Sequence, residues 1–483
     1  MIKVLVLNPP SPSSVNVIRD QIYGCWCKGK RIGGASTPPY PLVQIATVLK
    51  ERGIAVKVID ALGEKIALNE LKRDIAQFDI LVVLTSVMTF SEDAQVLRYL
   101  KQVHRNIRTV ICGALPTFMP EFCLKQEEVD IIVRREPEFV IRDLVDALEK
   151  KEPWQNIPGI GYRENGKVVL NADYPLIENL DELPLLNWSL LSKKARYFNP
   201  LIRRYPYVTD QTTRGCPERC SFCMSPGFYG RRVRSRSAEN VIAGFKKHVR
   251  EGYKEVYLRD EMFTTFKARN KEICERMIKE HLDLNWICAA RVDSLNYEMM
   301  SLMKKAGCHA IKFGVESGVQ SILDAAKKRI TLKQTEDSFR WANQLGIHSH
   351  AHVMLGLPGE NKQTINQTID FLKKINPTTA TFGIVMPFPG TELFEMVAKN
   401  YPEIKDGFAL DLKMLHSSSF FTHTFCDLSA KELAYYIKKM HRDFYWRLPY
   451  LWQWLMRLRN IADLKRVFKA GMKIVDFSIR GDE

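Results

Sequence analysis

The sequence predicts an α/β protein in which a doubly wound parallel sheet is followed by a partial barrel and a helical extension. Continuous apolar strands alternate with helices in the first 150 residues, a pattern typical of parallel sheets covered on both faces. A second series of six strand–helix units follows, which predicts parallel strands curled into a partial barrel. Beyond this series the pattern becomes helical, basic and rich in aromatic residues.

The chain has 483 residues and a formal net charge of +16, and its length indicates more than one domain. We place the sheet domain at 1–150, a linker at 151–204, the barrel at 205–395 and the extension at 396–483. Eleven cysteines in a chain of this length do not indicate a small secreted disulfide scaffold. The N-terminus enters a strand directly, and no apolar run reaches the roughly 18–20 residues of a membrane span. We therefore expect a cytoplasmic protein.

The first domain is expected to have a Rossmann-like fold. Its predicted elements are helices Leu42–Glu51 and Val140–Lys150 and strands Ile2–Asn8, Val56–Asp60, Ile80–Leu84, Arg108–Cys112 and Asp130–Arg134. In such a sheet a ligand binds beyond the carboxyl ends of the strands. The candidate ligand contacts at that edge are Pro9, Ser86, Gly113, Thr117 and Glu136. No GxGxxG motif follows the first strand, so a dinucleotide is not expected.

The second series predicts a partial TIM-type (β/α)6 barrel. Its predicted strands are Tyr207–Thr213, Glu255–Arg259, Asn285–Arg291, Ala310–Val315, His348–Gly356 and Thr379–Met386. Its predicted helices are Ala238–Arg250, Lys267–His281, Tyr297–Ala306, Thr335–Leu345 and Gln363–Ile375. Chemistry in barrels of this kind takes place at the carboxyl ends of the strands.

Cys216, Cys220 and Cys223 form a CxxxCxxC run directly after the first barrel strand. Three thiolates at this spacing suit three corners of a [4Fe–4S] cluster, which normally takes four thiolate ligands. The fourth iron then keeps an open position for a small molecule that carries its own ligands. A zinc site is the alternative, but zinc needs a fourth ligand, and the next candidates, His248 and Cys274, lie well downstream.

At this point the sequence resembles the radical S-adenosylmethionine (SAM) enzymes over roughly residues 205–393. The similarity includes the cysteine loop with Phe222 before its last cysteine, Gly314-Val315-Glu316-Ser317-Gly318, Gly356-Leu357-Pro358-Gly359-Glu360 and Pro387-Phe388-Pro389-Gly390-Thr391. In this family SAM occupies the open iron, and its reductive cleavage yields a 5′-deoxyadenosyl radical.

The resemblance implies that the three cysteines ligate the cluster. The positions that it implies for SAM are Phe222 near the adenine, Asp260 and Glu261 at the methionine ammonium, and Glu316, Gly356 and Pro358. One departure concerns the second strand, which ends in Gly-Gly-Glu in many relatives and in Asp260-Glu261 here. A carboxylate at this position can still accept a hydrogen bond from the ammonium.

Two further groups of barrel residues have alternative interpretations. Arg291 and Asp293 either contact SAM or substrate, or form an ion pair between barrel layers. His348, His350 and His352 alternate along one strand and therefore share one face. Their strand spacing suits a metal poorly, and a substrate-facing or proton-donating role is the stronger alternative.

The first domain looks like the cobalamin-binding domain of the class B radical SAM enzymes. The similarity lies in the domain order and in Asn8-Pro9-Pro10, Pro38-Pro39, Gly113-Ala114-Leu115-Pro116-Thr117 and Arg135-Glu136-Pro137-Glu138. Relatives often carry Gly-Gly-Pro-His and Gly-Glu-Gly-Glu at the last two motifs. No Asp-x-His-x-x-Gly motif is present, as expected in a class that usually has no histidine below the cobalt. The alternative is a domain that keeps the fold and has lost the corrinoid.

The C-terminal extension is basic and aromatic. Between residues 431 and 480, twelve basic and four acidic side chains are interleaved with Phe, Tyr and Trp. Such helices suit the surface of an anionic membrane. The equal alternative is a helical cap whose aromatic residues pack on the barrel. No nucleic acid is expected, because no recognition motif accompanies the basic tail.

These observations together predict a radical SAM enzyme that acts with cobalamin on an unactivated carbon, with methyl transfer as the leading outcome. The expected substrate is a lipid-like or other natural product, and the expected electron donor is a flavodoxin or ferredoxin. Ring formation or oxidative rearrangement, with or without cobalamin, is the first alternative. A non-catalytic iron–sulfur scaffold is the second. The expected location is the cytoplasm, either free or at the inner membrane surface.

Overall fold

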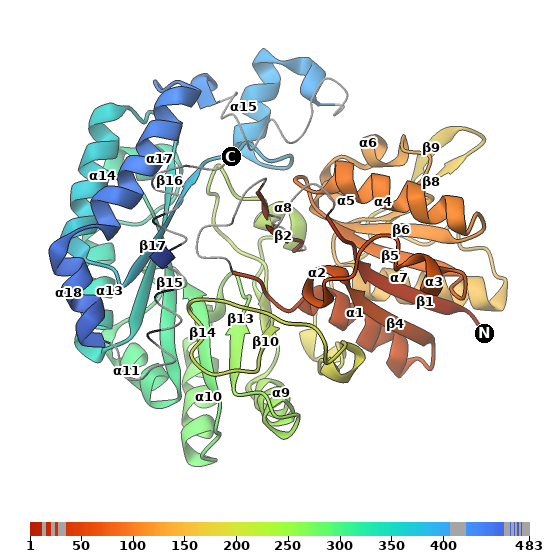
Figure 1. Cartoon of the computed structure of the whole chain (residues 1–483), viewed down its shortest axis with the longest axis horizontal. Coiled ribbons are helices and arrows are strands. Elements are labelled where there is room, and N and C mark those ends of the chain that lie inside the picture. Colours follow the sequence, from red (N-terminus) through yellow and green to blue (C-terminus); the bar gives the residue numbers. More distant parts are fainter. Residues whose placement is uncertain are drawn as a thin grey trace.

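The computed structural model describes residues 1–11, 16–20, 25–27, 35–405 and 422–457, and beyond these only 464, 468, 471, 472 and 475. Two lobes lie side by side (Figure 1). The first lobe is built on a sheet with the strand order β4-β1-β5-β6-β7-β8-β9, in which β8 and β9 run antiparallel. Its strands are β1 (Lys3–Asn8), β4 (Ala55–Asp60), β5 (Ile80–Thr85), β6 (Arg108–Gly113), β7 (Ile131–Val133), β8 (Ile160–Glu164) and β9 (Lys167–Leu170).

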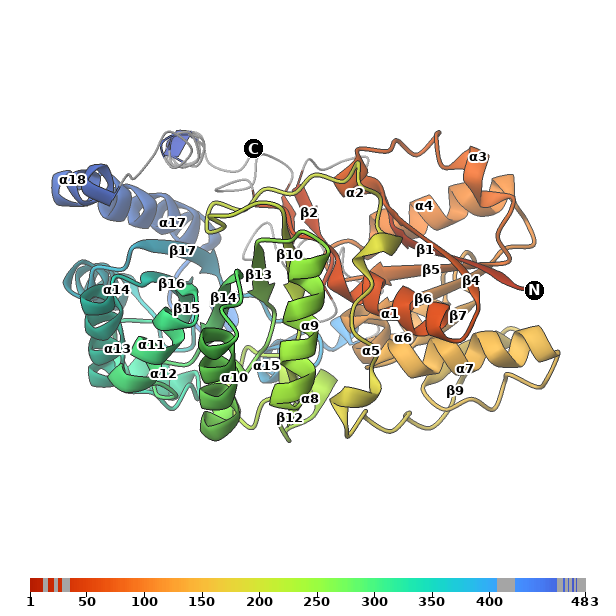
Figure 2. The ribbon, with the colours of Figure 1, turned by 90° about the horizontal axis from the view of Figure 1, so that it is seen from below.

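Helices cover both faces of this sheet. The main ones are α1 (Tyr40–Glu51), α4 (Phe90–Val103) and α7 (Pro137–Lys150), and short helices α2 (Ala61–Glu64), α3 (Lys72–Ile75), α5 (Ala114–Phe118) and α6 (Pro120–Leu124) complete the layers. Val4 and Val6 pack with α1 and α7, whereas Leu5 and Leu7 pack on the α4 side. Figure 2 shows α4 and α7 on opposite sides of the sheet. The predicted doubly wound fold is therefore confirmed.

The sequence analysis predicted neither α4, nor the short helices α2, α3, α5 and α6, nor strands β8 and β9. Helix α4 is amphipathic, with Val96, Leu97 and Leu100 buried. Strands β8 and β9 form a hairpin within the segment expected to be a linker, and they extend the first sheet to Leu170. The hairpin turns at Asn165-Gly166, where both residues have positive φ. Asn-Gly is a strong signal for a two-residue hairpin turn, so this element was predictable.

The second lobe is a partial barrel of six parallel strands in the order β10-β13-β14-β15-β16-β17. They are β10 (Tyr207–Asp210), β13 (Glu255–Leu258), β14 (Asn285–Ala290), β15 (Cys308–Glu316), β16 (His348–Leu355) and β17 (Thr379–Ile384). The principal helices that follow them are α9 (Ala238–Arg250), α10 (Lys267–Lys279), α11 (Tyr297–Lys305), α12 (Gln320–Ala325), α13 (Leu332–Leu345), α14 (Lys362–Ile375) and α15 (Glu392–Asn400).

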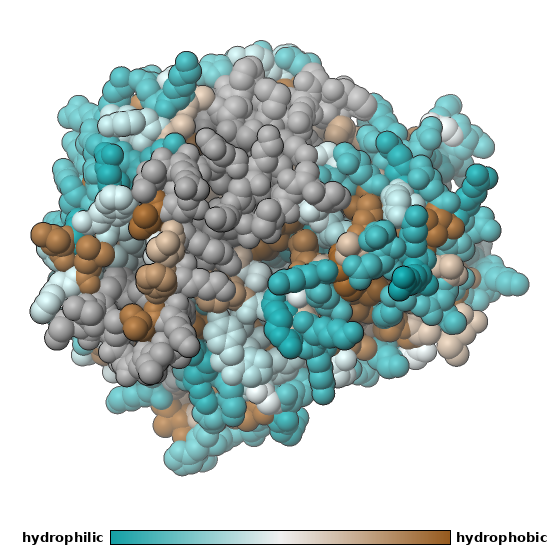
Figure 3. All heavy atoms as spheres, in the orientation of Figure 1, coloured by the Kyte–Doolittle hydropathy of each residue, from teal (hydrophilic) through white to brown (hydrophobic). Residues whose placement is uncertain are grey.

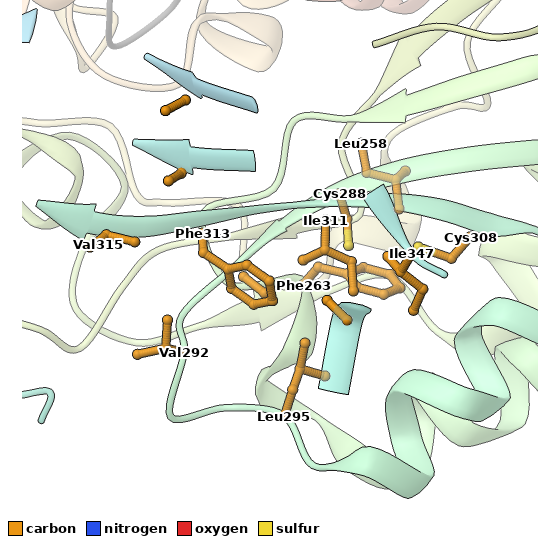
Figure 4. Close-up of a cluster of buried hydrophobic side chains, with 14 of the residues drawn as sticks. Leu258, Phe263, Cys288, Val292, Leu295, Cys308, Ile311, Phe313, Val315 and Ile347 are labelled. Atoms are coloured by element: carbon orange, nitrogen blue, oxygen red, sulfur yellow. The ribbon is translucent and has the colours of Figure 1, made fainter. Parts of the chain in front are cut away.

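Alternate residues of each barrel strand face outward and pack against these helices. Leu258, Cys288, Ile311 and Phe313 are buried there with Phe263 (Figure 4). The outward layer is apolar because it forms the main core of the lobe. The intervening residues face the interior of the barrel, which is therefore lined by a different set of side chains.

The two lobes share an apolar core near the carboxyl ends of their strands. Leu115 and Met119 of the first lobe belong to one cluster with Phe228 and Phe388 of the second. Gly390 lies directly against the ring of Phe118, where a Cβ atom would approach the ring to 2.4 Å. The ligand-binding edges of both sheets are thus held toward each other.

The C-terminal helices α17 (Ala430–Tyr445) and α18 (Leu448–Arg457) follow the barrel. A capping box between Ser429 and Glu432 begins α17. The Tyr445 hydroxyl accepts a hydrogen bond from the Ala380 N–H at 2.9 Å, so α17 covers the edge strand β17. None of the described helices is long and apolar enough to cross a membrane.

Candidate active site

The three cysteines lie on one loop between β11 (Thr213–Arg214) and α8 (Ser225–Tyr229). Gly215 precedes them with φ of 93°, and a Cβ atom there would stand 2.2 Å from the Arg232 carbonyl oxygen. The loop is held by hydrogen bonds from Cys216 N–H to the Gly230 carbonyl (3.2 Å) and from Ser221 N–H to the Ala326 carbonyl (3.1 Å). Glycine is required at this close backbone approach, which sets the direction of the loop.

The thiols of this loop are half-buried and unpaired by any disulfide. Burial raises the pKa of Cys216 to about 12 and that of Cys220 to about 11. The positive charges of Lys328 and Arg291 act in the opposite direction on the pKa of Cys220. The raised pKa values favour the protonated form of Cys216 and Cys220 in the absence of metal, and metal binding displaces the proton.

Within the described part of the chain, no three His, Cys, Asp or Glu side chains are placed to ligate one metal ion. A cluster makes a different demand, because each thiolate binds its own iron and the sulfurs need not converge on one point. Three thiols on one loop, beside two cations that favour their charged form, fit the cluster better than a zinc ion.

Asp260 and Glu261 both follow β13, but their side chains have different surroundings. Asp260 accepts hydrogen bonds from the N–H and the hydroxyl of Thr212, both at 2.5 Å, and burial raises its pKa to about 6. The buried Glu261 Oε2 has no hydrogen-bond partner among the described residues. Burial, followed by the nearby charges of Asp260 and Asp20, holds the pKa of Glu261 well above its usual range.

An unsatisfied buried carboxylate oxygen is costly unless a ligand completes it. An ammonium group would supply the missing donor at Glu261 and also favour its charged form. The methionine end of SAM carries such a group, so Glu261 fits the predicted contact. Asp260, by contrast, fastens the segment that leads into the cysteine loop.

Glu316 ends β15 in a left-handed conformation, with φ of 62°, at a register shift of the ladder to β16. Its carboxylate accepts a hydrogen bond from Lys328 Nζ at 2.5 Å, and both side chains are nearly buried. The same ammonium lies 5.9 Å from the centroid of the Phe222 ring. The structure thus joins Glu316 to the cysteine loop through Lys328, a residue that the sequence analysis did not single out.

The Gly356–Glu360 turn after β16 is stabilised by a hydrogen bond between its first and last residues. Glu360 accepts a hydrogen bond from the N–H of Gly356, and burial raises the pKa of Glu360 to about 7. Gly359 N–H donates to the Phe425 carbonyl at 2.9 Å. Contacts of Gly356 and Pro358 with SAM stay predictions, since the Gly356 N–H already has an internal acceptor.

Arg291 forms the ion pair that was one of its two predicted roles. Its guanidinium donates to both carboxylate oxygens of Asp293, at 3.0 and 2.8 Å. It also lies 3.8 Å from the carboxylate of Glu218 inside the cysteine loop. Arg291 therefore contributes positive charge beside the cluster ligands, whether or not it touches SAM.

The strand ends of the first lobe carry a buried polar network. Arg19 donates to Asp93 at 2.6 and 2.9 Å and to the Pro9 carbonyl at 2.9 Å. Ser86 is buried and its N–H donates to the Thr89 hydroxyl at 3.2 Å.

Gly113 and Thr117 also make contacts that stabilise the local backbone. A Cβ atom on Gly113 would stand 2.3 Å from the Thr85 carbonyl oxygen. The Thr117 hydroxyl donates to the Gly113 carbonyl and accepts from the Arg135 N–H, each at 2.8 Å. These residues stand at the predicted edge and shape its backbone.

Glu136 belongs to an ion network between the lobes. Both of its carboxylate oxygens accept from Arg234, at 2.8 and 2.9 Å, and Arg214 is paired with Glu138 at 2.6 Å. Burial alone would raise the pKa of Glu136, but Arg214 and Arg234 outweigh it and lower that pKa. The structure therefore gives Glu136 a role in joining the domains.

The donor set of the first lobe fits a corrinoid that takes no histidine from the protein. Residues 1–170 contain a single histidine, His104. Its Nε2 lies 3.1 Å from the Phe78 carbonyl oxygen, at the end of the sheet away from the ligand-binding edge. The described residues at the predicted edge therefore include no histidine that could bind cobalt.

Two family models match the chain: the radical SAM superfamily over residues 211–372 and the B12 binding domain over residues 33–145. An uncharacterized methyltransferase of Pyrococcus horikoshii is 33% identical over 404 residues, which is 83% of this chain and 84% of the relative. The chain belongs to the cobalamin-binding radical SAM enzymes.

Other relatives of this radical SAM enzyme differ in their described reactions. An anaerobic magnesium-protoporphyrin IX monomethyl ester cyclase of Rubrivivax gelatinosus is 28% identical, over 76% of this chain and 67% of the relative. The methyltransferase TsrM of Kitasatospora setae, solved with cobalamin and a [4Fe–4S] cluster, superposes with a TM-score of 0.68 at 18% identity. That alignment covers 84% of this chain and 79% of the other, and it shows a shared fold.

The cofactors of this radical SAM enzyme are the [4Fe–4S] cluster, SAM and cobalamin. The structure brings Glu316, Arg291 and Phe222 together around the cysteine loop through Lys328, while Glu136 stands apart in the domain interface. Lys328 lay outside every motif that the sequence analysis used. Lys328 follows α12 in a run of Lys and Arg. Such a run has no hydrophobic periodicity from which a role for Lys328 could be predicted.

Proposed function

We propose that this enzyme transfers a methyl group to an unactivated carbon of an amphiphilic natural product. The single observation that carries the proposal is the Glu261 oxygen that has no partner among the described residues. Glu261 follows β13, which pairs with the barrel strand that precedes the three-cysteine loop, at the edge where the strand ends of both lobes face each other. When bound, the cluster and SAM supply hydrogen-abstracting chemistry, and the corrinoid supplies a transferable methyl group.

In this proposal the protein's own residues bind, orient and shield. Cys216, Cys220 and Cys223 hold the cluster, while Lys328 and Arg291 stabilise its thiolates. Glu261 orients the ammonium of SAM. The shared apolar core around Phe228 and Phe388 excludes water from the region between the lobes.

Anaerobic reconstitution with SAM, a reductant and a corrinoid tests the proposal. Wild-type protein should release 5′-deoxyadenosine, and the Cys220→Ala variant should release none. Protein that binds the cluster but never cleaves SAM would instead support an iron–sulfur scaffold. With a lipid extract as substrate, the product should gain one CH2 unit.

Ring formation is the second candidate, and the similarity to the Rubrivivax gelatinosus cyclase favours it. The same product analysis separates the two reactions. Methyl transfer adds one carbon atom to the substrate. Ring closure removes two hydrogen atoms and adds no carbon.

An acidic flavodoxin or ferredoxin is the proposed electron donor. A surface cleft of about 350 Å³ beside the cysteine loop is lined by Arg219, Lys327, Arg329 and Asp324. Arg219 directly precedes Cys220, and the Ser221 N–H donates to the carbonyl of Ala326, the residue at the end of α12 that directly precedes Lys327. Exposed cations so close to the cluster ligands would steer an acidic partner to this face.

We also propose that the C-terminal extension lies on an anionic membrane surface. Leu448 of α18 is 81% exposed and Trp452 is 64% exposed. Figure 3 shows apolar residues at the left edge of the molecule, where Figure 1 places α18. The location that follows is the inner surface of the cell membrane, which suits an amphiphilic substrate.

A further inference from the structure

Part of the inner wall of the barrel is accessible to solvent. Outward-facing residues such as Ile311, Phe313 and Val353 are buried. The residues that alternate with them face inward and stay partly exposed: Ala289, Lys312, Gly314, His352, Met354, Thr381 and Gly383. A filled barrel would bury both sets, so this pattern indicates space along the inner wall, from the middle of the strands to their carboxyl ends.

A cationic group lies on this inner wall. The Tyr257 hydroxyl accepts a hydrogen bond from Lys312 Nζ at 2.6 Å and another from Arg259 Nη1 at 3.2 Å. Arg259 is also paired with Asp20, which offsets one of the two positive charges. Lys312 has two more N–H donors, and no described residue accepts from them. Among the residues that the structure describes, one positive charge on the wall thus has no counter-ion.

The neighbouring side chains are polar and uncharged. Burial, followed by the charge of Lys312, holds the pKa of both His350 and His352 well below the usual range. His350 is hydrogen-bonded to Thr379 at 2.7 Å, and His352 to Thr381 at 2.8 Å. The wall therefore presents neutral hydrogen-bonding groups beside the Lys312 ammonium. The carboxylates of Glu255 and Glu316, on the same two strands, are engaged by His309 and Lys328.

We propose that the barrel interior binds an oxyanion of the substrate, a phosphate or a carboxylate, at Lys312 and the Tyr257 hydroxyl. This inference rests on the proposed function, because it names the anionic end of that enzyme's substrate. Lys312 stands four residues before Glu316 on β15, about 13 Å at roughly 3.3 Å per residue. The substrate is then an elongated molecule whose anionic end lies deep in the barrel and whose reacting carbon lies near the cysteine loop.

Tyr257 offers a direct readout of anion binding. Burial would raise its pKa, but Lys312 and Arg259 outweigh burial and lower that pKa to about 8. An anion bound to Lys312 offsets the positive charge that stabilises the phenolate. The pKa of Tyr257 should therefore rise toward its usual value near 10 when the site is filled.

The experiment uses full-length reconstituted enzyme labelled with ¹³C at the tyrosine ζ carbon. The Tyr257 resonance, assigned with Tyr257→Phe, is titrated against pH in sodium phosphate, sodium acetate or sodium chloride of equal ionic strength. Phosphate alone raising the pKa supports a phosphate-bearing substrate, and acetate acting equally well extends the class to carboxylates. In Lys312→Met the response should vanish, whereas Lys305→Met, which removes an exposed lysine of α11, should respond like wild type.

A Tyr257 pKa that is the same in all three salts would overturn the proposal. So would an anion response that persists in Lys312→Met. The proposed function is tested separately, by 5′-deoxyadenosine release from the wild-type sample without substrate. Cleavage of SAM with no anion response would therefore remove the oxyanion site and leave the enzyme assignment in place.

Discussion

Single residues at the carboxyl ends of the strands have different roles in the site. Asp260 and Glu261 are adjacent in sequence. Asp260 accepts a hydrogen bond from the backbone of Thr212, whereas Glu261 has a buried oxygen with no partner among the described residues. Lys328 pairs with Glu316 and also stabilises the charged form of Cys220. Of the neighbouring carboxylates Asp260 and Glu261, Glu261 is therefore the one available to a ligand.

Replacing Glu261 by Gln should weaken SAM binding about 10- to 100-fold. The reason is that a hydrogen bond to a charged group contributes roughly 1.5–3 kcal/mol, and each 1.36 kcal/mol is a factor of ten. Equilibrium binding of SAM to reconstituted protein measures the change. Glu272→Gln, on the exposed face of α10, is the matched control and should bind SAM like wild type. An unchanged affinity in Glu261→Gln would contradict this role.

At the scale of elements, periodicity predicted most of the fold. The six barrel strands and five of the barrel helices, including α9 (Ala238–Arg250), lie close to where alternation and helical spacing placed them. Helices α12 and α15 were not predicted. The hairpin at Asn165-Gly166 was not predicted, although Asn-Gly is a strong signal for a two-residue hairpin turn. The partners of Glu136 could not be predicted, because Arg214 and Arg234 lie about a hundred residues away and only the packing of the lobes brings them together.

The buried network between β11 and α7 should contribute strongly to stability. Arg214→Met removes an ion-pair partner of Glu138, which is fully buried, and breaking a buried pair costs about 3–5 kcal/mol. Arg232→Met is the matched control, because Arg232 and its partner Glu178 are 80% and 64% exposed and such surface pairs contribute little. Thermal unfolding of the reconstituted proteins compares the two. Equal melting temperatures for both variants would show that the network does not hold the lobes together.

At the scale of the whole molecule, the proposed function assigns three separate surfaces to three classes of partner. In that proposal the facing strand ends hold the cofactors, the basic cleft beside the cysteine loop receives the electron donor, and α18 lies on the membrane. A substrate at a membrane and a donor in the cytoplasm could then be engaged at the same time.

The basic cleft predicts that electron transfer from an acidic donor depends on salt. Arg219→Glu with Arg329→Glu should slow SAM cleavage driven by flavodoxin about tenfold at low ionic strength, relative to cleavage driven by dithionite. The difference should shrink at high salt, where exposed charges are screened. Lys267→Glu with Lys271→Glu makes the same charge change on α10 and is the control. A ratio of the two rates that matches this control would exclude the cleft as the docking surface.

The C-terminal helices should bind anionic vesicles through both charge and apolar contact. Leu448 and Trp452 are exposed on α18, and Leu464, Phe468 and Met472 are exposed at helical spacing beyond it. Burying such a side chain contributes roughly 1.5–3 kcal/mol, and each basic residue near an anionic surface adds about 1 kcal/mol. Leu448→Ser with Trp452→Ser should therefore reduce binding to phosphatidylglycerol vesicles at least tenfold in a sedimentation assay. Tyr297→Ser, which removes an exposed aromatic ring from α11, should bind like wild type. Equal sedimentation of wild type with phosphatidylcholine and phosphatidylglycerol vesicles would mean that the basic residues play no part, and full binding by the double variant would place the contact elsewhere.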